Sequence, residues 1–136
     1  MKAKDLATAK AKIVRLYNDM TIEEALKVIL KSNLTSVPVL ERVSNRYVYS
    51  LSSNALLKKI VQAKGNGSVY SETISSVPLE RFIVPCDSET EVENLMDLVV
   101  NQNFVPLVDN AGVFQGIVTR KAVINYMIDK LATIEE

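Results

Sequence analysis

The sequence lacks histidine and contains a single cysteine, Cys86. Histidine is the commonest general base and metal ligand near neutral pH, so the usual acid–base and zinc chemistry is missing. One cysteine cannot form an internal disulfide, and no histidine is present to activate it as a nucleophile. The four glycines form no glycine-rich phosphate-binding pattern. These absences argue against most classes of enzyme and metalloprotein.

Charge of one sign is not in excess, because 16 basic and 16 acidic residues balance. Broad surfaces that bind nucleic acid polymers or membranes need a basic excess, so neither partner is expected. No apolar run approaches the ~18 residues of a membrane-spanning helix. The N-terminal residues also lack the apolar core of a signal peptide. We therefore expect a cytoplasmic protein.

What the sequence does contain is enough apolar residues, 48% of 136, to bury a core in one domain or two small ones. Hydrophobic periodicity predicts the order strand, helix, strand, strand, helix, and this order occurs twice. The first set has strands at 13–16, 36–40 and 47–51 and helices from 22 to Asn33 and from 52 to 61. The second set has strands at 82–84, 104–108 and 113–118 and helices at 92–100 and 119–131.

Two helices share a start signal and an apolar face. Thr21 with Glu24, and Thr90 with Glu93, form the S/T-x-x-E pattern of a capping box. Apolar residues follow at helical spacing on one face of each helix. These face residues are Ile22, Ala25, Leu26, Ile29 and Leu30 in the first helix and Val92, Leu95, Met96, Val99 and Val100 in the second.

The two sets align by simple offsets, which indicates an internal repeat. An offset of 70 relates the first strands and the apolar helix faces, 68 relates the Val-Pro strands, and 67 relates the final helices. The predicted divisions are a first repeat with its N-terminal arm at 1–62, a connector at 63–73 and a second repeat at 74–136. Units this small bury little surface alone, so we expect them to pack about a pseudo-twofold axis with a ligand-sized cleft between them.

Thr119, Arg120 and Lys121 stand where the last strand meets the last helix. A hydroxyl and two cations at a helix start can hold an anion such as phosphate. The simpler interpretation is an N-cap hydroxyl followed by two solvated cations. Ser52 occupies the corresponding place in the first repeat, and the same two interpretations apply to it.

Three motifs carry a resemblance to a known family: V-P-V at 37–39, V-P-L at 105–107 and G-I-V-T-R at 116–120. They resemble the tandem CBS-domain pair, also called the Bateman module, over about residues 4 to 132. The resemblance implies an α+β fold with α/β-type layers, in which each CBS repeat runs β-α-β-β-α. It also implies a regulatory module without enzymatic activity or a required cofactor. The implied ligand is an adenine nucleotide in the inter-repeat cleft.

The resemblance also implies which residues contact the nucleotide. Two short segments and two Val-Pro strands would flank the base, and the helix-start residues would contact ribose or phosphate. The implied ligand-binding residues are Ile13, Val14, Ser36, Val37, Pro38, Tyr49, Ser52, Ile83, Val84, Phe104, Val105, Pro106, Thr119, Arg120 and Lys121.

The sequence departs from the family pattern at three places. Ala55 and Ala122 replace the aspartate that often holds ribose hydroxyls, and Tyr49 replaces a glycine in the first repeat. A cyclic dinucleotide has fewer free ribose hydroxyls than a mononucleotide, so the loss of aspartate affects it less. The chain is similar to stand-alone CBS-pair proteins of Gram-positive bacteria that bind cyclic di-AMP. This ligand is therefore preferred over AMP or ATP.

Three functions are compatible with these observations. The first is a nucleotide-responsive homodimer that signals to a regulated partner protein. The second is a degenerate CBS pair that serves as a dimerisation or scaffolding module without binding nucleotide. The third is an enzyme restricted to Asp, Glu, Lys, Ser or Tyr chemistry, for which no residue constellation stands out.

Overall fold

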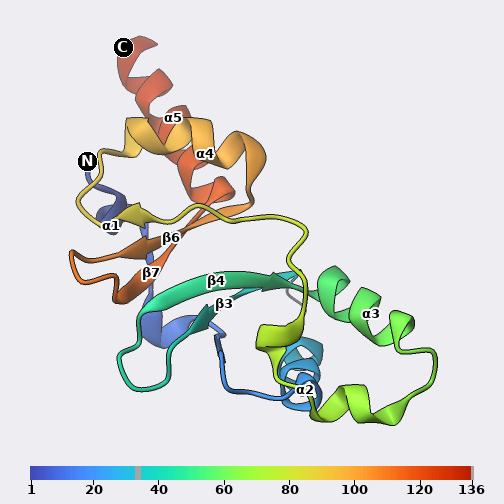
Figure 1. The fold of residues 1–136 in the computed structure, drawn as a ribbon. Coiled ribbons are helices and arrows are strands. Elements are labelled where there is room, and N and C mark those ends of the chain that lie inside the picture. Colours follow the sequence, from blue (N-terminus) through green and yellow to red (C-terminus); the bar gives the residue numbers. More distant parts are fainter. Residues whose placement is uncertain (33–34, 136) are drawn as a thin grey trace. The chain divides into compact units, whose positions relative to one another are not determined.

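The computed structural model describes residues 1–32 and 35–135, and these divide into two compact units. One unit is Val14–Phe82, and the other combines Met1–Ile13 with Ile83–Glu136. Each unit contains a small sheet with helices packed beside it, which confirms the predicted α+β class (Figure 1). The predicted end of the first helix at Asn33 lies outside the described residues.

The unit Val14–Phe82 is built around a three-stranded sheet in the order β2-β3-β4. Strand β2 runs parallel to β3, and β4 runs antiparallel to it. The core of this unit includes Leu16, Val37 and Leu56, all fully buried. Its elements are β2 (Leu16–Tyr17), α2 (Ile22–Ser32), β3 (Ser36–Leu40), β4 (Tyr47–Ser52), α3 (Ser53–Gln62), η2 (Gly67–Ser71) and η3 (Ile74–Ser76).

The second unit has a four-stranded sheet in the order β1-β7-β6-β5. Its core includes Ala3, Leu95, Val105 and Val118. Its elements are α1 (Ala3–Leu6), β1 (Thr8–Ala9), η1 (Lys10–Lys12), β5 (Cys86–Asp87), η4 (Val92–Leu95), α4 (Met96–Asn101), β6 (Phe104–Val108), β7 (Phe114–Thr119) and α5 (Arg120–Glu135).

The internal repeat is confirmed by the strand register. Leu16 pairs with Val39 in one unit, and Cys86 pairs with Leu107 in the other, at the predicted offsets of 70 and 68. Both hairpins also shift register at the same place, between Val39 and Leu40 in one and between Leu107 and Val108 in the other. The agreement extends from sequence to individual backbone pairs.

The predicted strands at Ile13–Leu16 and Phe82–Val84 are wrong by about three residues. The strands are Leu16–Tyr17 and Cys86–Asp87. Asn18 N donates to Leu40 O, and Ser88 N donates to Val108 O, so the backbone of Leu40 and Val108 faces these strands. Two residues earlier, the equivalent positions are Pro38 and Pro106, which have no N–H to extend the ladder. The ladders therefore begin late in both units.

One capping box formed and the other did not. Thr21 N donates to Glu24 Oε1 at 3.1 Å, and Glu24 N donates to Thr21 Oγ1 at 3.2 Å. The second helix instead begins as η4, whose N-cap Glu91 makes no side-chain capping bond. The carboxylate of Glu93 accepts hydrogen bonds from residues of α5 instead of returning to Thr90.

The apolar faces of the two predicted helices are confirmed except at their last members. Leu30 is 80% exposed and Val100 is 75% exposed. The residue before each of them still contacts the core, Ile29 in one helix and Val99 in the other, so the buried face ends one position earlier than predicted. The partly buried Val28 packs on the core near this end of α2.

The N-terminal arm belongs to the second compact unit, whereas the sequence assigned it to the first repeat. Strand β1 pairs antiparallel with β7, joining Thr8 to Ile117 and Ala9 to Gly116. Upstream of this strand, Ala3 N donates to Thr90 O, and Val92 N donates to Met1 O. Figure 1 shows α1 beside the β6–β7 hairpin.

The segment after α3 plays the corresponding part in the unit Val14–Phe82. Ile74 N donates to Met20 O, and Ile22 N donates to Glu72 O. Val69, within the predicted connector 63–73, is buried in the core of this unit. The segment that precedes the first repeat in sequence thus packs in the second unit. The segment that precedes the second repeat packs in the unit Val14–Phe82.

Candidate functional site

In the second unit the candidate site lies where β7 meets α5. Thr119 pairs with Phe104 in register, and its Oγ1 accepts a hydrogen bond from Ala122 N at 3.1 Å. The hydroxyl is therefore the N-cap that the sequence predicted. The side chain is only partly buried, so capping does not remove it from the surface.

Arg120 is anchored at this junction by both its backbone and its side chain. Its N donates to Asn103 O at 2.8 Å, and its Nε donates to Val99 O at 2.7 Å. The second bond satisfies a carbonyl near the C-terminal end of α4. This holds the guanidinium in a defined position. Neither Arg120 nor the exposed Lys121 forms an ion pair with another described residue.

The segment Ile83–Val84 is joined to the start of β6 through Gln102. Val84 N donates to Gln102 Oε1 at 3.0 Å, and Gln102 Nε2 donates to Val84 O at 2.9 Å and to Phe104 O at 3.0 Å. Gln102 is 5% exposed. Sequence analysis did not identify it, although a polar residue between an apolar helix and an apolar strand was a usable signal.

The first unit repeats this junction with serines. Ser36 pairs with Ser52 in register, and Ser52 Oγ accepts a hydrogen bond from Ala55 N at 3.0 Å. Ser53 N donates to Thr35 O at 2.9 Å, as Arg120 N does to Asn103 O. The geometry of the two junctions is therefore alike, but the first has no cation following its hydroxyl.

The side chain of Tyr49 makes its contacts within its own unit. Its hydroxyl donates to Asn18 Oδ1 at 2.9 Å, and the ring packs on the core. Burial raises the pKa of Tyr49 to about 12, so the hydroxyl stays protonated at neutral pH. These contacts assign Tyr49 a packing role within the unit Val14–Phe82.

The remaining predicted site residues fall into two groups. Val14, Val37 and Pro38 lie in the unit Val14–Phe82, whereas Ile13, Val105 and Pro106 lie in the other. The four Val-Pro residues are buried, Val14 is partly buried and Ile13 is 9% exposed. Within the second unit the structure brings Phe104 together with Thr119, and within the unit Val14–Phe82 it brings Ser36 together with Ser52.

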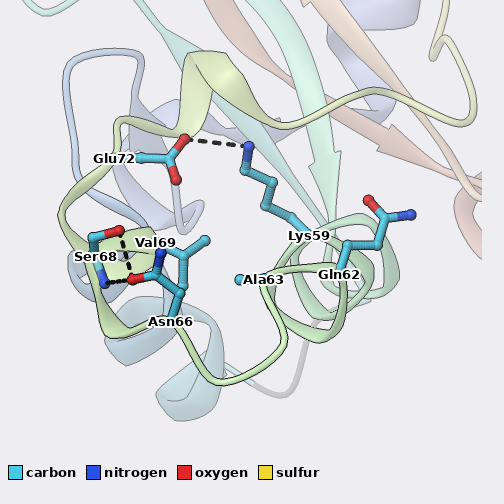
Figure 2. Close-up of a pocket in the computed structure, with 7 residues that line it drawn as sticks. All are labelled: Lys59, Gln62, Ala63, Asn66, Ser68, Val69 and Glu72. Atoms are coloured by element: carbon cyan, nitrogen blue, oxygen red, sulfur yellow. Dashed lines mark hydrogen bonds and ion pairs between the residues drawn. The ribbon is translucent and has the colours of Figure 1, made fainter.

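The surface of the unit Val14–Phe82 includes a smaller and a larger cavity that are not lined by any predicted site residue. The smaller, of about 230 Å³, lies between α3 and the segment that follows it, and Lys59 Nζ reaches Glu72 Oε1 there at 3.2 Å (Figure 2). The larger, of about 570 Å³, includes Asp19 and Arg42, whose side chains form an ion pair at 2.8 Å. Each cavity contains paired charges and has no excess of either sign to attract a nucleotide.

No cluster of metal-ligating side chains occurs within residues 1–32 and 35–135. Burial raises the pKa of the Cys86 thiol, which disfavours the thiolate that metal binding or nucleophilic attack requires. No helix within the described ranges has the length and apolar character needed to cross a bilayer.

Comparison with solved structures finds the same fold in other proteins. A CBS domain-containing protein of unknown function from Bacillus anthracis strain Ames Ancestor is similar with a TM-score of 0.81 and 22% identity, covering 96% of this chain and 94% of that chain. CbpB in complex with c-di-AMP has a TM-score of 0.85 and 15% identity, with coverage of 99% and 89%. CBSX2 in complex with AMP has a TM-score of 0.74 and 20% identity, with coverage of 94% and 96%.

Comparison at the sequence level gives the family. No curated protein matches the chain significantly. The family model of the CBS domain matches twice, at residues 3–62 and 74–129. These two matches follow the internal repeat and cover most of the sequence. This chain therefore belongs to the CBS-domain family and carries two CBS domains in tandem.

Proposed function

We propose that this chain is a non-enzymatic regulatory module that binds an adenine nucleotide, preferably cyclic di-AMP, in the cleft expected between its repeats. The observation that carries the proposal is the junction at Thr119–Lys121. There a hydroxyl, an anchored guanidinium and an exposed ammonium lie together at the start of a 16-residue helix. Positive charge at the N-terminal end of a helix is the feature that favours phosphate binding.

Two similar structures support a nucleotide as the ligand, because CbpB was solved with c-di-AMP and CBSX2 with AMP. The preference for a cyclic dinucleotide comes from Ala55 and Ala122. Neither alanine has a carboxylate for ribose hydroxyls. Ala55 is buried, and Ala122 packs on the core of its unit. We propose that the response to the nucleotide passes to a partner protein. We propose that this takes place in the cytoplasm and that the chain acts as a homodimer.

Lys121 provides the cleanest test of the phosphate contact, since Arg120 also stabilises the end of α4. Lys121→Ala is expected to raise the Kd for cyclic di-AMP about fivefold, the loss of roughly one exposed charge interaction of about 1 kcal/mol. Isothermal titration calorimetry with cyclic di-AMP, AMP and ATP measures this. Lys31→Ala, which removes another exposed lysine, serves as the control and leaves the Kd unchanged. Lack of binding by all three nucleotides contradicts the proposed function, whereas unchanged binding by Lys121→Ala contradicts only the contact.

The second candidate is a dimerisation or scaffolding module that binds no nucleotide. The hydrogen bond between Tyr49 and Asn18 favours this second candidate. Where the family pattern has a glycine, the first repeat has a tyrosine that packs within its own unit. This function predicts a dimer whose melting temperature is unaffected by adenine nucleotides. A ligand that binds the native state must raise that temperature, so a thermal-shift assay separates the two candidates.

A further inference from the structure

The backbone at Pro106 leaves the β5–β6 ladder with a missing donor. Ser88 N donates to Val108 O, so the polar backbone groups of Val108 face β5. Backbone direction alternates along a strand, and Pro106 therefore faces the same side. Proline has no N–H, so the next bond of the ladder, to the carbonyl of Val84, cannot form.

The side-chain amide of Gln102 stands where this ladder stops. Its Nε2 donates to Val84 O at 2.9 Å, which supplies the donor that Pro106 lacks. Its Oε1 accepts from Val84 N at 3.0 Å, and Nε2 also donates to Phe104 O at 3.0 Å. In a direct continuation of the ladder, Val84 N would bond to Phe104 O. The amide instead lies between these two backbones and bonds to both.

Burial makes this arrangement stable and fixes its orientation. Gln102 is 5% exposed, while Val84 is 47% exposed. The carboxamide can satisfy one N–H and two carbonyls only with Oε1 toward Val84 N and Nε2 toward the carbonyls. The residue is placed by the backbone as well, because it ends α4 in an extended conformation and its N donates to Leu98 O at 3.0 Å.

We propose that Gln102 is a positioning residue for the nucleotide site of the second repeat. It holds Ile83–Val84 beside the start of β6 at the separation set by an intervening amide, so that the two segments expected to flank the base keep a fixed spacing. The polar backbone atoms of Val84 are directed to Gln102, and the exposed side chain of Val84 is left for contact with the base. This inference rests on the proposed function.

Gln102→Leu tests the inference, because leucine removes the amide and is the residue at the corresponding sequence position of the first repeat, Leu34. The expected result is a tenfold or greater rise in the Kd for cyclic di-AMP, measured by calorimetry. Amide exchange followed by NMR on the ligand-free protein is expected to show protection of the Val84 N–H in the wild type and its loss in the variant. A purely structural role would change stability without changing affinity.

Two further variants keep the test decisive. Gln102→Glu retains an acceptor for the Val84 N–H but loses the donor to both carbonyls. We therefore expect it to keep protection of the Val84 N–H while its affinity for cyclic di-AMP falls. It also replaces Gln102→Leu if that variant does not fold. Gln115→Leu removes a glutamine amide from β7, where Nε2 donates to Val113 O at 3.2 Å, and leaves the Kd unchanged.

The outcomes separate this inference from the proposed function. Wild-type affinity in a folded Gln102→Leu variant overturns the positioning role and leaves the proposed function standing. Absence of Val84 protection in the wild-type protein overturns the role whether or not nucleotide binds. If the wild type binds none of the nucleotides, the proposed function fails, and the role of Gln102 in nucleotide binding fails with it. Exchange of the Val84 N–H still tests the contact between Gln102 and Val84 in that case.

Discussion

At Gly116 the N-terminal arm lies too close to β7 to leave room for a side chain. A Cβ built at this position would lie 2.5 Å from the carbonyl oxygen of Thr8, and φ is +156°. Because the obstructing atom belongs to the backbone of β1, a side-chain rotation cannot relieve the contact. The glycine of the G-I-V-T-R motif therefore serves strand pairing here. Tyr49, its counterpart in the first repeat, lies in β4, which pairs only with β3 in its described sheet.

Gly116→Ala is expected to destabilise the protein by about 1–3 kcal/mol, the range for forcing an extra carbon into a packed site. Denaturant unfolding measures the change in free energy. Gly67→Ala is the matched control, since no heavy atom lies within 4 Å of its added Cβ. Equal stabilities of the two variants would show that β1 does not hold this position.

At the scale of elements, Glu93 links η4 to α5. Its Oε1 accepts hydrogen bonds from the Tyr126 hydroxyl at 2.6 Å and from Lys130 Nζ at 3.1 Å. These donors lower the pKa of Glu93 from 4.5 to about 2, with the Tyr126 bond as the largest cause. The contribution to stability is present above pH 4.5 and is lost as the pH falls toward 2, where the carboxylate becomes protonated.

Glu93→Gln should therefore lower the free energy of unfolding at pH 7 more than at pH 2.5. Urea unfolding at both pH values measures the difference between variant and wild type. Glu23→Gln removes only an exposed pair with Lys27, at 3.7 Å, and should show little effect at either pH. A pH-independent cost for Glu93→Gln would contradict the assigned interaction.

The elements also show which parts of the fold could be predicted. The helix faces and hairpins follow from periodicity, and the offsets of 70, 68 and 67 anticipate the paired register. The starts of β2 and β5 could not be predicted by hydrophobicity, because Ile13–Val14 and Ile83–Val84 are as apolar as true strands. Their exclusion from the ladders depends on the missing N–H of one proline in each neighbouring strand, Pro38 in β3 and Pro106 in β6. That constraint becomes visible only once the register is known.

The candidate site was predictable to a similar extent. Thr119 and Ser52 were identified as helix caps from the hydroxyl at the strand–helix boundary, and both hydrogen bonds formed. The contact of Arg120 with Val99 and the role of Gln102 depend on long-range packing, with bonds across 21 and 18 residues. Local pattern carries no information about such pairs.

At the scale of the whole molecule, the repeat relates two exposed apolar helix faces. Leu57 and Val61 of α3 are 55% and 74% exposed, and their counterparts at an offset of 67, Ile124 and Ile128 of α5, are 47% and 57% exposed. Exposed apolar side chains at helical spacing favour association with another helix. We expect these faces to form the proposed homodimer.

Ile128→Lys should weaken the dimer, because a charge would be desolvated at the contact. Light scattering over a range of protein concentrations should show at least a tenfold rise in the dissociation constant. Val43→Lys introduces the same side chain at a 97% exposed turn position and should leave association unchanged. A monomeric wild type, or equal association of both variants, contradicts the proposed interface.

The N-terminal segment packs with the second half of the chain, and this determines which fragments of the protein are expected to fold. We expect the fragment Val14–Phe82 to fold without the rest of the chain, because it carries the whole of its own sheet and core. A fragment that begins at residue 74 would instead lack β1 and Ala3, and would leave β7 as a bare edge. Isolation of the second half requires residues 1–13 to be fused ahead of Ile83. The compact units of the structure and the repeated segments of the sequence thus have different boundaries.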